Sequence, residues 1–483
     1  MVLNLKNVLT CFERYVKKAM REWRVPGMAV SVVKEDRLIY ARGFGVKKLG
    51  SSSRVNEKTV FQIGSVSKSF TAALVSKLVD EGRFGWKDRV KDYLPEFRLY
   101  DPPATGDFRV EDLMSQRSGL PPHSGRLLPH LGFSRKYIIN NLHLIKPSSS
   151  FRSEYSYQNN LFLAAADLVE KQTGKSWEQN LLEKFLIPLN MVSTTATLKA
   201  YRSLPNTAHG HYYARSGPED PVTALSKNWP YYYWVYTIAP AGGINSNVID
   251  ISRWVILHLR EGVFDKKRLV STRNIKFLQA PMIDAGLGPW GETRRYCQGW
   301  IRSEYYPYPI LWHNGGTSGM KSIVAMVPEA GIGITVLCNL SGVLFPEAIS
   351  RYWLDLWFGK TPHDWSGDLL RVQKAETRRL EEPPAPYTPP RPLRYYSGTY
   401  YNSLYGLLTV VSHSGSLVLV MGRKKIRKKL ALWGGDTFVL HWPGVINEGA
   451  GVQFYGGRSG IVESVEIEGM NDDLTGVFTK VRL

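Results

Sequence analysis

A run rich in proline most strongly limits how this chain of 483 residues can fold. Five of the nine residues from Glu382 to Pro390 are proline. Proline fixes the φ angle and lacks an amide hydrogen, so neither a helix nor a central β-strand continues through such a segment. Prolines at this density favour an extended, semi-rigid linker. We therefore predict separate domains, with residues 361–392 forming a short charged helix and this linker.

The residues before the linker, 1–360, predict one mixed domain. Residues 1–23 have the apolar spacing of an amphipathic helix, and residues 28–40 alternate as a β-hairpin does. Further helices are expected at 65–81, 161–171 and 248–260, and buried strands at 323–327 and 332–337. Strands near both ends with helices between them predict an α+β fold, whose antiparallel sheet is built from the two ends of the domain.

The residues after the linker, 393–483, predict a small all-β domain. Short apolar segments recur there at regular spacing and are separated by Gly, Ser, Asn or Asp, as in a barrel or sandwich. The segments are 407–412, 417–421, 437–442, 452–455 and 461–467. A basic run, Arg423–Lys429, lies between two apolar segments, and we interpret it as a solvated hairpin.

Charge and cysteine content narrow the possible partners. The net charge of +20 suits an anionic partner, but the basic run lacks the interleaved aromatic residues of a nucleic-acid groove. No apolar stretch reaches the roughly 18 residues that span a bilayer. Cys11, Cys297 and Cys338 lie too far apart for a disulfide framework or a metal site. We therefore predict a cytoplasmic protein with no metal, cofactor, nucleic-acid or membrane partner, and leave a homo-oligomer open.

Three short motifs carry the candidate chemistry: Ser65-Val66-Ser67-Lys68, Tyr157-Gln158-Asn159 and His313-Asn314-Gly315. Each motif alone is weak, because patterns this short recur by chance. Ser65, however, begins a predicted helix, and Lys68 lies three positions on, so both side chains share one helical face. An amine buried there loses proton affinity and can act as a base. Without the other motifs, Ser65 would be read as a helix N-cap.

As an ordered set, these motifs resemble those of class C β-lactamases and their relatives. The relatives include penicillin-binding DD-peptidases, family VIII esterases and peptidases of the CubicO group. Residues 61–71 look like the nucleophile motif, and the resemblance covers about residues 10–360. The other matching segments are 110–121, 157–161, 170–174, 239–243 and 313–319. The resemblance implies a β-lactamase/transpeptidase-like fold, and residues 396–408 resemble the lipocalin-like β domain of many such peptidases.

The resemblance also implies catalytic roles. Ser65 would attack a carbonyl carbon, and Lys68 and Tyr157 would share the proton transfers to and from it. Which of the two takes the serine proton stays open. Asn159 would hold a substrate amide oxygen or the lysine.

The third motif would complete the site. The backbone N–H groups of Ser65 and Gly316 would form an oxyanion hole, with Gly315 allowing close backbone approach. His313 stands where β-lactamases carry lysine. A histidine offers a weaker and pH-dependent positive charge, so a β-lactam carboxylate is less well provided for.

An aromatic stretch, residues 228–236, precedes the segment at 239–243. Trp234 and its neighbours suit a pocket wall for an apolar or peptidic substrate, and they suit core or oligomer packing equally well.

These features together predict a serine hydrolase that forms an acyl-enzyme on small esters, amides or short peptides, including peptides with D-residues. The alternatives are a β-lactamase or DD-peptidase, and a catalytically silent penicillin- or peptide-binding protein of the same fold. Two rival motifs are absent, since the sequence contains no G-x-S-x-G elbow and no H-E-x-x-H.

Overall fold

The computed structural model describes residues 5–214, 217–226, 228–288, 291–304, 307–379, 390–442, 444–456, 461–470 and 476–481. It contains two compact units, each assembled from two stretches of the chain. The first unit combines residues 1–88 with 165–377, and the second combines 89–164 with 378–483. Most of the predicted proline-rich linker, residues 382–389, lies outside the described residues. The predicted boundaries at residues 360 and 392 stay predictions.

The first unit is built on an antiparallel sheet of eight strands among the described residues, in the order β2-β1-β14-β13-β12-β11-β10-β9. The strands are β1 Gly27–Lys34, β2 Arg37–Gly45, β9 Ile283–Leu287, β10 Thr293–Tyr296, β11 Ile301–Glu304, β12 Ile310–Thr317, β13 Met320–Val327 and β14 Ile332–Cys338. Strand β1 pairs with β14, so the two ends of the predicted domain meet in the sheet. This confirms the predicted α+β fold with an antiparallel sheet.

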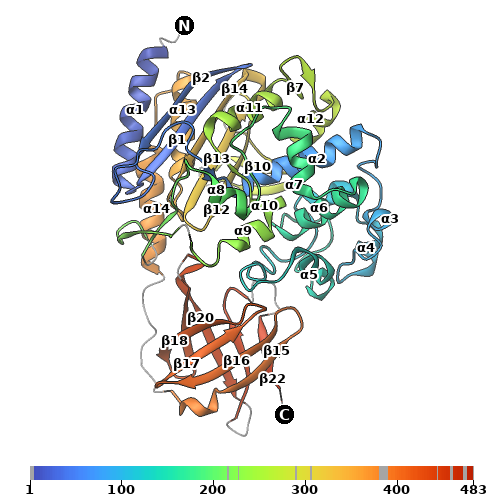
Figure 1. Ribbon diagram of the computed structural model, residues 1–483, viewed down its shortest axis with the longest axis vertical. Coiled ribbons are helices and arrows are strands. Elements are labelled where there is room, and N and C mark those ends of the chain that lie inside the picture. Colours follow the sequence, from blue (N-terminus) through green and yellow to red (C-terminus); the bar gives the residue numbers. More distant parts are fainter. Residues whose placement is uncertain are drawn as a thin grey trace. The chain divides into compact units, whose positions relative to one another are not determined.

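Two helices from opposite ends of the unit cover one face of the sheet (Figure 1). They are α1 (Leu5–Glu22) and α13 (Phe345–Trp357). Phe12 meets Trp353 edge to face at 5.1 Å between ring centroids, and both side chains are fully buried. The helix predicted at the N-terminus is thus confirmed for residues 5–22. Its apolar face packs into the core that it shares with α13.

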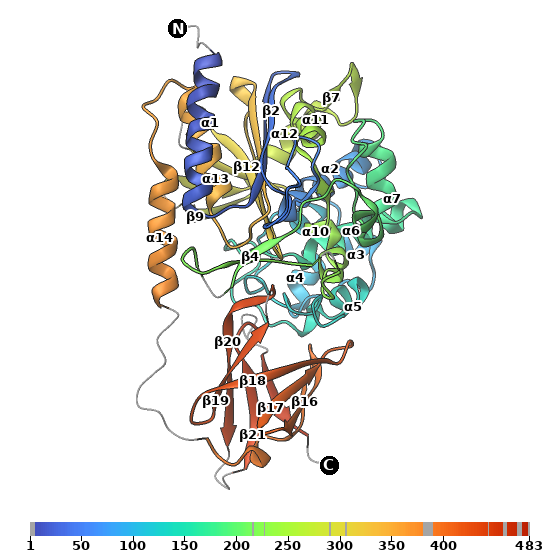
Figure 2. The same ribbon diagram turned by 60° about the vertical axis from the view of Figure 1, so that its left-hand side comes forward.

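The charged helix predicted within residues 361–392 is also present, as α14 (Trp365–Arg379). Figure 2 shows α14 next to α1. The indole nitrogen of Trp23 donates a hydrogen bond to Ser366 Oγ at 2.9 Å, which ties the end of the α1 segment to the start of α14.

The other face of the sheet carries the helices that follow the nucleophile motif (Figure 1). Helices α2 (Ser67–Asp80) and α11 (Val248–Leu259) pack together through stacked Phe70 and Trp254, 3.8 Å between centroids. Ser31 Oγ of β1 donates to the carbonyl of Val248 at 3.0 Å, which joins α11 to the sheet. Further α-helices of this unit are α7 Trp177–Leu181, α8 Leu198–Ser203, α9 Tyr233–Thr237, α10 Ala239–Gly242 and α12 Thr272–Gln279.

Helix α11 carries a buried histidine that makes stability depend on pH. His258 lies between the rings of Trp254 and Trp300, 4.9 and 5.0 Å from their centroids. Burial lowers the pKa of His258 from 6.5 to about 3. The unfolded chain therefore binds one more proton at this site between pH 6.5 and 3, and the free energy of unfolding falls as the pH falls through that window.

We expect His258→Phe, which keeps an aromatic ring of similar size in the cluster, to reduce this acid sensitivity. The slope of unfolding free energy against pH should drop by about one proton between pH 6 and 4. Urea titrations of both proteins across that range measure the slope. Equal slopes would contradict the assignment to His258.

The second unit contains a closed antiparallel barrel of strands β15 to β22 among the described residues (Figure 1). The strands are β15 Gly398–Asn402, β16 Gly406–His413, β17 Ser416–Met421, β18 Ile426–Gly434, β19 Thr437–Trp442, β20 Ile446–Gly456, β21 Val462–Ile467 and β22 Val477–Lys480. Strand β22 pairs with β15, so the sheet closes on itself and leaves neither end strand as an open edge. The predicted small all-β domain is confirmed.

The rest of the second unit is made of short helices. They are α3 Val90–Tyr93, α4 Pro102–Asp107, η2 Val110–Met114, α5 Arg135–Asn140 and η3 Leu142–Leu144, followed by the start of α6 Asn160–Thr173. Tyr137 of α5 donates its hydroxyl to the carbonyl of Leu404 at 2.9 Å, so α5 is attached to the barrel.

The basic run forms the turn of the β17–β18 hairpin, as predicted, and the side chains of Arg423, Lys424 and Lys425 are exposed. The turn is not only solvated. The amide of Lys424 donates to the carbonyl of Leu131 at 3.3 Å, so this hairpin also holds the barrel to residues before α5.

In the part of the chain that the structure describes, no helix has both the length and the apolar character that a membrane span needs.

Candidate active site

Ser65 lies at the centre of a tight turn before helix α2. The α-helix begins at Ser67, and residues Gly64–Val66 form a 3₁₀ turn, η1. The expectation that Ser65 opens the α-helix is therefore wrong by two residues. Ser67 explains the difference, because its hydroxyl donates to the carbonyl of Gly64 at 2.7 Å and accepts from the amide of Ile244 at 3.1 Å. These bonds fix the turn, and Ser65 caps no helix.

Lys68 contacts Ser65 as the motif predicts. Its Nζ lies 3.0 Å from Ser65 Oγ and 2.9 Å from the carbonyl oxygen of Ala241. The side chain of Lys68 is fully buried, and this burial lowers the pKa of its amine well below the usual value. An uncharged amine can donate to Ala241 while its lone pair accepts the hydroxyl proton of Ser65. The pair can therefore generate a nucleophilic alkoxide.

Strand β12 approaches this turn so closely that glycine is required on both sides. A methyl group on Gly64 would lie 2.6 Å from the amide nitrogen of Gly316, and one on Gly315 would lie 2.8 Å from the amide nitrogen of Ser65. Gly64 also has a φ of +51°, which side chains disfavour. The amides of Ser65 and Gly316, the predicted oxyanion donors, thus belong to two backbones in direct contact.

His313 is a buried residue of the same strand. It is 1 % exposed, and burial lowers its pKa to about 3. Its Nδ1 lies 2.6 Å from the carbonyl oxygen of Asn314, and its Nε2 lies 3.2 Å from the hydroxyl of Tyr296. Since a carbonyl only accepts, Nδ1 carries the proton and Nε2 accepts from Tyr296. At neutral pH, His313 provides no positive charge.

The aromatic stretch divides into two groups. Trp229 and Tyr232 are buried and meet at 5.2 Å between ring centroids, which is core packing. Trp234 is half-buried, and its indole nitrogen donates to Ser318 Oγ at 3.1 Å. Ser318 lies in the turn after β12, so Trp234 stands beside the strand that carries Gly315 and Gly316.

Tyr157 and Asn159 belong to the second unit. Tyr157 is half-buried, and its carbonyl accepts the amide of His123 at 2.8 Å. The two rings lie 5.3 Å apart between centroids. The carbonyl of Asn159 accepts the amide of Phe162 at 3.1 Å, at the start of α6. The structure thus groups Ser65, Lys68, His313, Gly315, Gly316 and Trp234 in one unit, and the Tyr157 motif in the other.

Two partners were missed in the sequence. The carbonyl of Ala241 contacts Lys68, and the hydroxyl of Tyr296 contacts His313. Ala241 lies in the segment 239–243, which resembles the family, but every residue has a backbone carbonyl, so the residue type does not reveal this contact. Tyr296 is the last residue of β10, and no pattern in the sequence singled it out.

The described residues contain no group of three or more His, Cys, Asp or Glu side chains that could hold a metal ion. The buried thiols of Cys297 and Cys338 are free.

Comparison with known families gives two matches. The profile of the family described as Beta-lactamase matches residues 12–355. A second profile, described as a domain of unknown function (DUF3471), matches residues 382–479, which include the barrel.

Among characterised proteins, two fungal enzymes are similar along most of the chain. The unguisins hydrolase ungD' of Aspergillus campestris is 28% identical over 438 residues, covering 86% of this chain and 79% of that protein. The unguisins hydrolase ungD of Aspergillus violaceofuscus is also 28% identical, covering 83% and 76%. The protein flp of Staphylococcus aureus is 23% identical, covering 70% of this chain and 64% of flp.

Two solved structures share the fold. The octameric penicillin-binding protein homologue from Pyrococcus abyssi has a TM-score of 0.63 at 21% identity, covering 95% of this chain and 98% of that one. The crystal structure of SurE has a TM-score of 0.57 at 19% identity, covering 99% and 100%. At these identities the likeness concerns the fold.

Proposed function

Because the chain belongs to the Beta-lactamase family, we propose that it is a serine hydrolase that forms an acyl-enzyme on Ser65. The observation that carries the proposal is the contact between Lys68 Nζ and Ser65 Oγ at 3.0 Å, made by a fully buried amine. A serine hydroxyl is a poor nucleophile until a base is within reach, and a buried amine with a lowered pKa next to Ser65 Oγ supports Lys68 in that role.

The proposed reaction has two halves. Lys68 takes the proton of Ser65 as Oγ bonds to the substrate carbonyl carbon, and the amides of Ser65 and Gly316 stabilise the resulting oxyanion. When the tetrahedral intermediate collapses, the bond to the leaving group breaks and the leaving group takes a proton, delivered through Tyr157. Water then attacks the acyl ester by the same route, which releases the acid and restores Ser65.

We propose that the substrates are small esters, amides or short peptides, including peptides with D-residues. The uncharged state of His313 supports this choice, because a β-lactam carboxylate would gain no ion pair there at neutral pH. Trp234 offers an aromatic surface next to strand β12. The two fungal relatives are named as hydrolases of unguisins, not as β-lactamases.

We expect the kcat/KM for p-nitrophenyl acetate or D-alanine p-nitroanilide to exceed that for nitrocefin. The physical reason is the missing positive charge at position 313. Steady-state kinetics with the three chromogenic probes at pH 7 measure the ranking. If nitrocefin were preferred tenfold or more, about 1.4 kcal/mol of transition-state stabilisation, the β-lactamase alternative would replace our proposal. Absence of turnover with covalent labelling of Ser65 would favour a penicillin- or peptide-binding protein.

We add three proposals, on the type of the barrel domain, the location of the protein and its oligomeric state. We propose that the barrel is the lipocalin-like domain found in related peptidases, that the protein acts in the cytoplasm, and that it forms a homo-oligomer. The archaeal homologue of the same fold is described as octameric, which supports a test by light scattering.

A further inference from the structure

Hydrogen bonds join residues 152–156, which precede Tyr157, to residues 116–120. The amide of Arg152 donates to the carbonyl of Arg117 at 2.8 Å, and the amide of Ser156 donates to the carbonyl of Gln116 at 2.9 Å. Ser156 also donates its hydroxyl to the carbonyl of Leu120. The position of Tyr157 within the second unit therefore depends on this neighbouring segment.

The side chain of Gln116 forms two hydrogen bonds with the backbone of Gln158, the residue after Tyr157. The amide of Gln158 donates to Gln116 Oε1 at 2.6 Å, and Gln116 Nε2 donates to the carbonyl of Gln158 at 3.0 Å. Gln116 is 1 % exposed, so water cannot replace these bonds at low cost. Only an amide of this length can accept and donate at the same time here, because glutamate has no N–H and asparagine is one methylene shorter.

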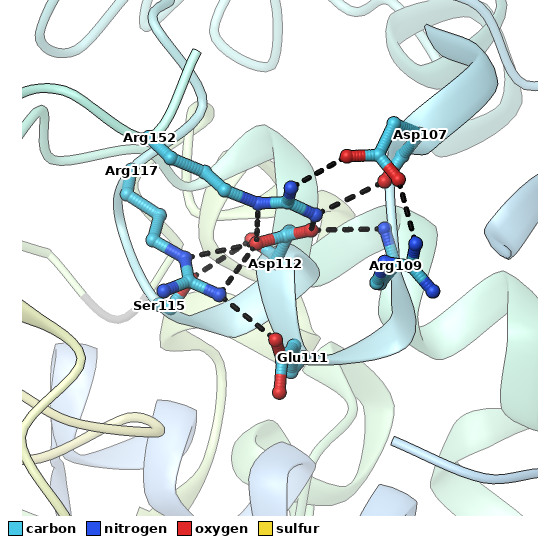
Figure 3. A network of polar contacts seen from close by, with 7 residues as sticks. All are labelled: Asp107, Arg109, Glu111, Asp112, Ser115, Arg117 and Arg152. Carbon is cyan, nitrogen blue, oxygen red and sulfur yellow. Dashed lines mark hydrogen bonds and ion pairs between the residues drawn. The ribbon is translucent and has the colours of Figure 1, made fainter. Parts of the chain in front are cut away.

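A buried carboxylate anchors both ends of this arrangement (Figure 3). Asp112 has no exposed surface, and the guanidinium groups of Arg117 and Arg152 both point toward it. Arg117 Nε lies 2.8 Å from Asp112 Oδ1, and Arg152 binds both carboxylate oxygens, at 3.1 and 2.6 Å. The two arginines belong to the two segments that the backbone bonds join, so Asp112 ties those segments together.

The charges around Asp112 are balanced. Arg152 also binds Asp107 Oδ2 at 2.6 Å, Arg117 binds Glu111 Oε1 at 3.1 Å, and Arg109 binds Asp107 Oδ1 at 2.8 Å. Three arginines thus meet three carboxylates (Figure 3). The carboxylates of Asp112 and Glu111 are buried, and buried charges are tolerated only when they are paired. A network of this kind fixes one arrangement of the side chains.

The backbone of these segments is strained where the network holds it. Gln116 has a φ of +58° and Arg152 a φ of +64°, and His123, whose amide binds the carbonyl of Tyr157, has a φ of +59°. Left-handed conformations of residues other than glycine cost of the order of 1 kcal/mol each and persist where the surroundings determine them. Three such residues contact or flank the short segment that carries Tyr157.

We propose that Gln116, together with the Asp112-centred arginine pairs, is a positioning device that fixes Tyr157 for proton transfer. Gln116, Arg117 and Arg152 are thus positioning residues of the reaction proposed above, on which this inference rests. They act through Tyr157 and do not contact the substrate. If these residues only stabilised the fold, replacing them would lower kcat equally whether or not Tyr157 is present.

A double-mutant cycle separates these roles. In Gln116→Glu, the second carboxylate oxygen faces the carbonyl of Gln158 and displaces the Tyr157 segment. With p-nitrophenyl acetate, we expect kcat to fall by about 10²-fold with KM nearly unchanged, the scale of a misplacement of about 1 Å. In a Tyr157→Phe background, the same change should cost less than about threefold, because the group being positioned is already gone. Equal losses in both backgrounds would overturn the proposal.

Two further variants complete the experiment. Gln453→Glu alters a half-buried glutamine of the barrel that donates to the carbonyl of Phe454 at 3.1 Å, so it is a matched control and should keep kcat within about twofold. Arg152→Lys keeps the positive charge and loses the bidentate contact with Asp112. If a thermal melt shows that Gln116→Glu does not fold, the same double-mutant cycle with Arg152→Lys tests whether the network positions Tyr157. Failure of the proposed function is recognised separately, by turnover that survives Ser65→Ala.

Discussion

Replacing Ser65 with alanine is expected to abolish turnover of every hydrolysed probe and to abolish labelling by a fluorophosphonate. The reason is that Oγ is the atom that Lys68 contacts at 3.0 Å. The fold should persist, because the turn at residues 64–66 is held by the hydroxyl of Ser67, and Ser65 makes no cap hydrogen bond. Steady-state assays measure turnover, in-gel fluorescence measures fluorophosphonate labelling, and circular dichroism measures retention of the fold.

Ser271→Ala provides the matched control. Ser271 is a true N-cap, whose hydroxyl accepts from the amide of Asn274 at the start of α12, at 3.2 Å. Its loss should cost about 1 kcal/mol of stability and leave turnover unchanged. The opposite pattern, with turnover retained in Ser65→Ala, would remove the whole mechanism and leave Ser65 a structural residue.

The periodicity of apolar residues was sufficient to predict several elements of the fold, but not strands β9–β12 or helices α12 and α13. The hairpin at the start, the helices after residues 65, 161 and 248, the paired strands β13 and β14, and the closing all-β domain are confirmed, because each pattern buries one face in a core. The start of α2 was misplaced, since the 3₁₀ turn depends on bonds from Ser67 to Gly64 and Ile244, and Ile244 is distant in the sequence.

The chemistry of the motifs could be predicted only in part. The contact between Ser65 and Lys68 follows from helical spacing, so it was available from the sequence. The charge state of His313 was not, because it depends on how deeply tertiary packing buries the ring and on the hydroxyl of Tyr296. The sequence suggested a weak positive charge there, whereas burial of the ring lowers its pKa to about 3. The network around Asp112 was likewise visible only as a stretch of family resemblance.

The roles of Tyr157, Asn159 and Trp234 stay predictions. Each of the three residues is half-buried. The aromatic stretch shows why a sequence pattern is ambiguous here, since Tyr232 packs into the core and Trp234 two residues later does not.

Lys68→Met is expected to reduce the acylation rate by at least about 10²-fold, the usual scale for a group that transfers protons. The same substitution should raise the melting temperature at pH 7. The pKa of Lys68 is lowered in the folded protein, so the unfolded chain binds one more proton below the usual lysine pKa of 10.5, and burying this amine costs folding free energy at neutral pH. Methionine has a similar length and no charge to desolvate, although it leaves the carbonyl of Ala241 without this donor.

The combination of lost activity and gained stability distinguishes a catalytic lysine from a structural one. A residue kept for folding loses stability when it is removed, whereas a buried base is retained despite its cost to folding. Lys184→Met is the matched control, because Lys184 is paired with Glu81 at 2.8 Å near the surface and should alter neither quantity appreciably. Stopped-flow acylation with p-nitrophenyl acetate and a thermal melt test both expectations. If Lys68→Met melted at a lower temperature and acylated normally, Lys68 would be part of the scaffold, and the base that activates Ser65 would have to be Tyr157.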